Sequence, residues 1–204
     1  MRRRYRFLQG FTLILAVLSL WPSPGWTADL GSQNPPPFKE KDLLAYKGKG
    51  RSTLTGQVFL VSSSGKAITQ AGVPVHLIPV TPFTRYRFDH HIRTTSCLSP
   101  DDETQNENAE PTRHPADCAE TALAQLLDEK RLLPYLRTTR ANPTGHFWFT
   151  KIPAGRYYIL SLIDGRTGSR QGERAAGIAW LTIDLEAGEK ASNVVVTDCR
   201  GHFC

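Results

Sequence analysis

Short apolar runs recur along much of this chain, and each is bounded by a cluster of turn-forming residues. In residues 73–77, Val73, Val75 and Leu77 fall at every second position, which is the period of a strand with one buried face. Runs of this kind lie at about residues 54–61, 73–77, 85–92, 137–141, 146–150, 156–163, 178–185 and 194–197. Seven or eight short strands with regular turns predict a mainly β fold, an antiparallel β-sandwich.

Residues 82–136 interrupt this pattern with an acidic loop and a helix. Asp117 can cap a helix, because Glu120 follows three residues later, and Pro134 ends the helical spacing. The apolar residues at this spacing are Ala119, Leu123, Leu126, Leu127 and Leu133. They predict one α-helix that packs against the rim of the sheet, and the alternative is a helix that binds a partner.

Four turn-and-strand motifs lie within residues 53–80 and 137–197. They read Gly56-x-Val58, Gly72-Val-Pro-Val-His-Leu77, Gly145-His-Phe-Trp-Phe149 and Ile152-Pro-Ala-Gly-Arg-Tyr157. Together they resemble the carboxypeptidase regulatory-like domain, a transthyretin-like (prealbumin-like) fold of exported bacterial proteins. The resemblance implies a Greek-key β-sandwich of seven to eight strands that binds or scaffolds without catalysis. The insertion at 82–136 departs from the family, so no ligand is carried over from it.

The N-terminus has the order of a secretory signal peptide. Four of the 25 Lys and Arg residues lie within the first six positions, an apolar run follows, and helix-breaking and small residues end at Ala28. We therefore expect residues 1–28 to be removed on export to the periplasm or outside the cell. A retained membrane anchor is the alternative, but the uninterrupted apolar part is short for a bilayer span. Without this segment the charge is nearly balanced and shows no basic stripe, so we expect no nucleic-acid partner.

The rest of the chain divides into three parts. We expect a Pro-rich polar arm at 29–52, which tethers the domain or straps across it, the β-sandwich at 53–198, and a tail at 199–204. The chain has four cysteines, Cys97, Cys118, Cys199 and Cys204. In an oxidising compartment they allow three disulfide connectivities, and we favour Cys97–Cys118 and Cys199–Cys204 because each pair brackets its own segment. A zinc site is the weaker alternative, because no Cys-x-x-Cys occurs.

Residues 85–92 hold the densest polar cluster. If they form a strand, Arg85, Arg87, Asp89 and His91 share one face and the intervening residues face the core. We predict that this face, with Arg137 and Arg140 nearby, binds an acidic ligand of the cell surface. The alternatives are a metal held by Asp89 and His91, or a solvated strand face with no ligand.

Trp148 alternates with Phe147 and Phe149 and must face the other way from them. It either faces outward, where an indole ring can stack on a sugar ring, or lies in a second packed surface under the inserted helix.

The sequence contains no motif of a serine hydrolase, zinc protease or phosphate-binding loop. We therefore predict a non-enzymatic exported module, without cofactor or metal, that binds a protein or polysaccharide of the cell envelope. One alternative is a structural accessory domain in which the arm and helix dock on a larger assembly. The other is a metal-dependent enzyme that uses His90, His91 or His146. The oligomeric state is not indicated.

Overall fold

The computed structural model describes residues 35–62, 65–93, 115–164 and 176–198. All of them belong to one compact unit of the chain, Asn34–Cys204. The predicted signal peptide, the acidic loop with Cys97, and the tail at 199–204 lie outside the described residues. Among the described residues, no helix is both long and apolar enough to cross a membrane.

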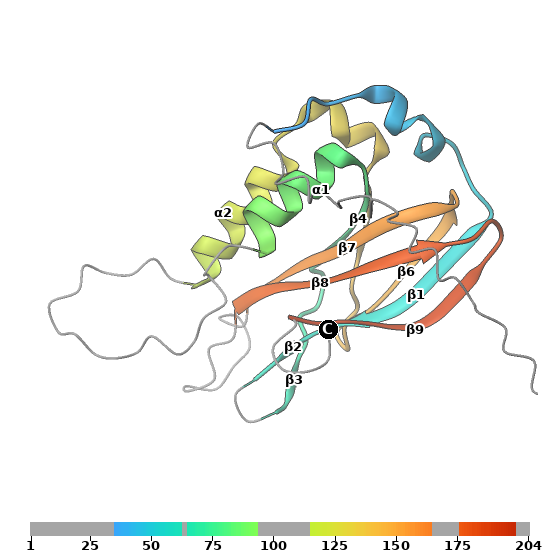
Figure 1. The fold of residues 1–204 in the computed structure, drawn as a ribbon. Helices are drawn as coiled ribbons and strands as arrows, with labels where there is room; N and C mark the ends of the chain where they lie inside the picture. The colour runs from blue at the N-terminus through green and yellow to red at the C-terminus, as the bar shows by residue number, and fades with distance from the viewer. Residues whose placement is uncertain (1–34, 63–64, 94–114, 165–175, 199–204) are drawn as a thin grey trace, which may run out of the picture. The chain divides into compact units, whose positions relative to one another are not determined.

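Nine strands of the described chain form three sheets (Figure 1). They are β1 (Ser52–Val58), β2 (Leu60–Val61), β3 (Ala67–Ile68), β4 (Pro74–Pro79), β5 (Arg137–Arg140), β6 (His146–Ile152), β7 (Gly155–Asp164), β8 (Ala176–Leu185) and β9 (Lys190–Val196). The sheets have the orders β6-β1-β9, β5-β4-β7-β8 and β2-β3. Every pairing of these strands is antiparallel except that of β1 with β9, which is parallel. The prediction of a mainly β fold is confirmed, whereas the Greek-key order stays a prediction.

The two larger sheets share one buried cluster of side chains. Leu54 and Phe147 enter it from the three-stranded sheet, and Val75, Leu77 and Ile159 enter it from the four-stranded sheet. The predicted alternation is confirmed for Val75 and Leu77 of β4 and for Phe147 and Phe149 of β6, which are all turned into this cluster. Burial of these apolar side chains is the main force that holds the sheets together.

A helical layer covers the other face of the four-stranded sheet (Figure 1). It consists of α1 (Pro82–Phe88), the π-helical turn η3 (Asp89–Arg93), α2 (Pro115–Leu127) and the 3-10 helix η5 (Lys130–Tyr135). Its apolar side chains form a second buried cluster with Ile78, Leu160 and Ile178 of the sheet. Strand β7 is therefore buried on both faces, with Tyr157 in the first cluster and Tyr158 in the second.

The predicted strand at 85–92 is wrong, because the chain there forms α1 and η3. Thr81 caps the helix with Thr84: each hydroxyl oxygen accepts from the other residue's backbone N–H, at 2.8 and 3.2 Å. Pro82 at the first helical position has its φ already set for a helix. Phe88 and Ile92 are four residues apart, and both are buried in the second cluster. The capping signal and this helical spacing outweigh the β propensity of the segment.

The predicted helix after residue 117 exists, but its ends differ from the prediction. Asp117 lies inside α2, which runs over Pro115–Leu127. Pro134 does not end α2, since it lies within the separate helix η5, and Leu133 is 54% exposed. Ala119, Leu123 and Leu126 are buried as predicted.

The described part of the predicted arm, from residue 35 onward, packs on the domain as a strap. It contains the short 3-10 helices η1 (Glu40–Asp42) and η2 (Leu44–Tyr46). Leu43 between them is buried, and the Tyr135 hydroxyl donates to Glu40 Oε1 at 2.7 Å. The Tyr46 ring meets the Tyr157 ring edge-on, with centroids 5.2 Å apart.

Candidate ligand-binding groove

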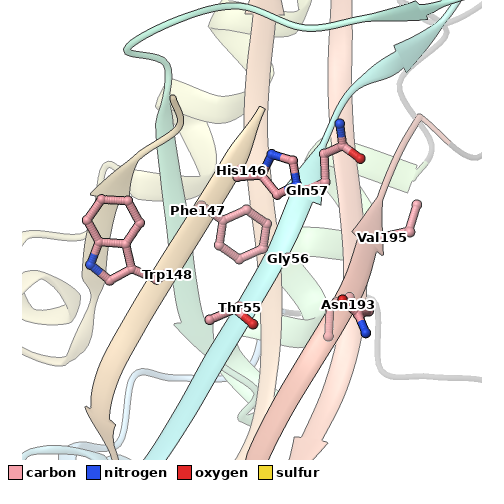
Figure 2. Close-up of a pocket in the computed structure, with 9 residues that line it drawn as sticks. Thr55, Gly56, Gln57, His146, Phe147, Trp148, Asn193 and Val195 are labelled. Carbon is pink, nitrogen blue, oxygen red and sulfur yellow. The ribbon is translucent and has the colours of Figure 1, made fainter. Parts of the chain in front are cut away.

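A groove of about 350 Å³ lies on the three-stranded sheet (Figure 2). Its lining residues come from all three strands: Thr55, Gly56, Gln57, His146, Phe147, Trp148, Asn193, Val194 and Val195. The outward residues of β1 alternate with the buried Leu54, Gly56 and Val58. The strand period therefore places Thr55 and Gln57 on the surface that is turned away from the core.

Strand register arranges the outward side chains in two rows across the sheet. Gln57 pairs with His146 on one side and with Val195 on the other, which makes one row. Thr55 pairs with Trp148 in the next row. Directly opposed side chains on one face have Cβ atoms about 4.5–5.5 Å apart, so the members of each antiparallel pair are neighbours.

A bulge in β9 adds Asn193 to this surface. Between the pairs Leu54–Ala191 and Gly56–Val194, β9 has one residue more than β1. Asn193 lies in this bulge with φ of 58°, the left-handed region that Asn tolerates better than most residues. The extra residue breaks the alternation of the strand and re-aims its side chains, as bulges do. Figure 2 shows Val195 on the β9 side of Gln57, and Asn193 further along β9 at the level of Thr55.

Trp148 is the largest exposed side chain on this surface. It is 59% exposed and projects from the outer side of β6 (Figure 2). The interpretation that placed it under the inserted helix is therefore wrong. An exposed indole on a strand offers a flat apolar face beside hydrogen-bonding groups.

The floor of the groove depends on the glycine at position 56. A Cβ there would overlap the Val194 carbonyl oxygen and the ring of Phe147, which pairs with Gly56 across β1 and β6. The missing side chain lets β9 and the Phe147 ring approach the central strand closely, so Gly56 marks a close backbone approach.

A hydrogen-bond network at the turn before β6 holds two of the groove side chains. Asn142 Oδ1 accepts from Thr144 N at 3.0 Å, from Thr144 Oγ1 at 2.8 Å and from His146 N at 2.8 Å. Thr144 Oγ1 also lies 2.9 Å from His146 Nδ1. Gln57 Nε2 donates to the Thr144 carbonyl oxygen at 2.7 Å. The turn therefore orients both His146 and Gln57.

The lining residues include no Asp, Glu, Lys or Arg. His146 is the one histidine among the lining residues. Such a surface has hydrogen-bonding groups and an aromatic face but no formal charge when His146 is neutral. It is suited to an uncharged polar ligand rather than to a polyanion.

The residues predicted from the 85–92 segment do not form the single face that was expected. On a helix, positions four apart lie together, so Arg85 lies with Asp89 and Arg87 lies with His91. Arg87 donates to the Gln125 carbonyl oxygen and so links α1 to α2. Asp89 forms an ion pair with Arg93 at 3.1 Å. Burial and the nearby Arg87 lower the pKa of His91.

Arg137 and Arg140 have structural partners on the edge strand β5. Arg137 donates to the Gly48 carbonyl oxygen at 2.7 Å and so holds the strap. Arg140 donates to the Gly72 carbonyl oxygen at 2.6 Å. The ligand roles that we predicted for Arg85, Arg87, Asp89, His91, Arg137 and Trp148 stay predictions.

The histidines of the metal-enzyme alternative come from separate elements. His90 and His91 belong to η3, and His146 belongs to β6. In the part of the chain that the structure describes, no three His, Cys, Asp or Glu residues are placed to hold a metal ion. Cys118 is disulfide-bonded, and its partner lies outside the described residues.

Sequence reasoning missed Thr55, Gln57, Asn193 and Val195 as groove residues. The alternation of β1 predicts that Thr55 and Gln57 face outward, but alternation alone does not distinguish a ligand surface from solvent. Asn193 faces the groove because of a bulge, and no sequence pattern predicted that bulge.

Comparison with known proteins gives a likeness of fold. No family model and no curated protein matches the chain. A crystal structure of a putative carbohydrate binding protein, PA1324 from Pseudomonas aeruginosa, is similar with a TM-score of 0.54 and 21% identity. The match covers 80% of this chain and 99% of that one. The pilus backbone protein RrgB from Streptococcus pneumoniae matches with a TM-score of 0.25 and 12% identity, over 71% of this chain and 41% of that one.

Proposed function

We propose that this chain is a non-enzymatic, exported carbohydrate-binding module that holds a neutral glycan of the cell envelope in the groove of the three-stranded sheet. The observation that carries the proposal is Trp148, which stands exposed beside the row that holds the polar side chains of His146 and Gln57. The indole can stack on the apolar face of a sugar ring, while the polar row hydrogen-bonds to its hydroxyl groups.

Two further observations support this function. The absence of charge among the lining residues favours an uncharged polymer over an acidic one. The protein from Pseudomonas aeruginosa with a similar fold is named for carbohydrate binding. We also propose that the two larger sheets form the Greek-key β-sandwich of carboxypeptidase regulatory-like domains, since they share one buried cluster.

The first test is retention of the purified mature protein on immobilised polysaccharides. The panel contains neutral polymers (dextran, mannan, cellulose and chitin), the acidic polymer alginate, and peptidoglycan. We expect retention on at least one neutral polymer. Trp148→Ala lowers that affinity about tenfold, which corresponds to about 1.4 kcal/mol. The melting temperature stays unchanged, because the side chain is exposed.

Two control variants separate this site from the alternatives. Leu133→Ala removes an equally exposed apolar side chain from η5, and we expect unchanged retention. Arg85→Glu reverses an exposed charge on α1 and tests the acidic-ligand hypothesis. Loss of binding in Arg85→Glu, with binding kept in Trp148→Ala, would place the ligand on α1 and overturn the groove proposal.

Export needs its own measurement. The intact mass of the protein from its native compartment should lack about the first 28 residues. An unprocessed N-terminus would indicate a membrane-anchored module instead of a released one.

A further inference from the structure

We infer that the groove selects an uncharged sugar ring with two adjacent free hydroxyl groups, which donate to His146 Nε2 and to Gln57 Oε1. The inference rests on the proposed function and names the chemistry that the same site recognises. It follows from the direction of each hydrogen bond in the turn before β6.

The first step is the identity of the atom at Asn142 Oδ1. Two backbone N–H groups, of Thr144 and His146, point at it at 3.0 and 2.8 Å. A side-chain NH₂ could not accept from them, so the atom is the amide oxygen. The Thr144 hydroxyl also lies 2.8 Å from this oxygen. Because an amide oxygen cannot donate, the single hydroxyl proton of Thr144 is directed to Asn142.

The second step sets the tautomer of His146. The Thr144 hydroxyl has used its proton, so it can only accept from His146 Nδ1, which lies 2.9 Å away. Nδ1 therefore carries the proton of the neutral ring, and Nε2 presents a lone pair. Among the described residues, His146 Nε2 has no hydrogen-bond partner.

The third step orients Gln57. Its Nε2 donates to the Thr144 carbonyl oxygen at 2.7 Å, so its amide oxygen points away from the turn. Figure 2 shows this oxygen on the side of the Gln57 amide that faces β9. Since Gln57 and His146 are register partners on one face, the groove offers one acceptor on each of two neighbouring side chains.

Two neighbouring acceptors require a ligand that supplies two neighbouring donors. Adjacent hydroxyl groups of a sugar ring meet this requirement, and the Thr55–Trp148 row lies beside them for the apolar face of the ring. A carboxylate has only acceptors, and no lining residue carries a fixed positive charge to pair with it. An ammonium group would find no carboxylate among the lining residues. The site therefore favours neutral sugars over uronic acids and over amino sugars with a free amine.

The test measures the tautomer of His146 directly. In protein with ¹⁵N-labelled histidine, the ring nitrogen shifts of His146 at pH 8 should report a proton on Nδ1. Thr144→Val removes the hydroxyl but keeps the carbonyl that holds Gln57. We expect this variant to show a mixture of tautomers and about a fivefold weaker affinity for the retained neutral polymer. Thr150→Val is the matched control, since Thr150 is an exposed threonine of β6, the strand that carries His146, and it should change neither readout.

The outcomes separate this inference from the function on which it rests. A proton on His146 Nε2 in the wild-type protein overturns the inference and leaves carbohydrate binding standing. Stronger retention on alginate than on every neutral polymer also overturns it. Failure of the wild-type protein to bind any polysaccharide overturns both the proposed function and the inference.

Discussion

Phe88 of α1 stacks face to face on Tyr158 of β7, with ring centroids 4.0 Å apart and planes 8° from parallel. Trp180 of β8 meets the same Phe88 ring edge-on at 5.0 Å. These contacts bind the helical layer to the sheet at a strand that is buried on both faces. The described parts of the inserted segment, 82–93 and 115–136, thus belong to the folded core.

Truncation of this contact should be costly. Phe88→Ala removes a fully buried ring, and we expect a loss of about 3–5 kcal/mol in the free energy of unfolding. Tyr86→Ala, on the same helix but half-buried, should cost clearly less. Urea denaturation measures both variants. Equal losses would mean that Phe88 does not anchor the helical layer.

Two adjacent leucines test the strap. Leu43 is 1% exposed and Leu44 is 55% exposed. We expect Leu43→Ala to lower the free energy of unfolding by about 2–5 kcal/mol, because the side chain fills the second cluster. Leu44→Ala should change the free energy of unfolding by no more than about 0.5 kcal/mol. Chemical denaturation gives both values. If Leu43→Ala were neutral, the strap would not be part of the cooperative fold.

Alanine substitutions at two glycines with positive φ distinguish the effect of backbone strain from that of steric overlap. Gly145 and Gly72 have φ of 82° and 77°. An alanine at either costs roughly 1–2 kcal/mol for the left-handed conformation. At Gly145 the added Cβ would also overlap the Val58 carbonyl oxygen, whereas at Gly72 it meets nothing within 4 Å. We therefore expect Gly145→Ala to lower the melting temperature clearly more than Gly72→Ala does. The reverse order would contradict the close approach of this turn to β1.

His76 should make the protein less stable in mild acid. Burial lowers the folded-state pKa of His76 below its ordinary value of 6.5. Between these two pKa values the unfolded chain binds the proton more readily, so the free energy of unfolding falls as the pH drops through about 6.5. His76→Gln should flatten this dependence between pH 8 and pH 5.5. The comparison is made against wild type because the pKa of His91 is lowered too. An unchanged slope in His76→Gln would assign the effect to another group.

Reduction should destabilise α2. Cys118 is disulfide-bonded, and our prediction pairs it with Cys97. Closing that loop stabilises the folded state by about 3 kcal/mol on the chain-entropy model. We expect reduction and Cys97→Ser to lower the melting temperature alike. Peptide mapping without reduction identifies the pair, and a Cys118–Cys199 or Cys118–Cys204 link would refute our connectivity.

Local patterns in the sequence determined the strands and their inward faces. Every second residue of β4 is buried, and so are Phe147 and Phe149, because neighbouring side chains of a strand point to opposite faces. The Asn142–Gly145 turn has an equally local cause, since Gly145 adopts a φ that other residues resist. The helical spacing of Ala119, Leu123 and Leu126 is a local pattern as well.

The tertiary structure decided between the strand and helix signals of residues 85–92, and it alone decided the composition of the groove. The segment follows helical spacing because Phe88 and Ile92 must both reach a cluster built partly from β7 and β8, and that cluster is distant in sequence. The groove joins Gln57, His146 and Asn193 from three strands, and the strand register that unites them depends on long-range pairing. Outward positions look alike in a sequence, and only that pairing determines which of them become neighbours.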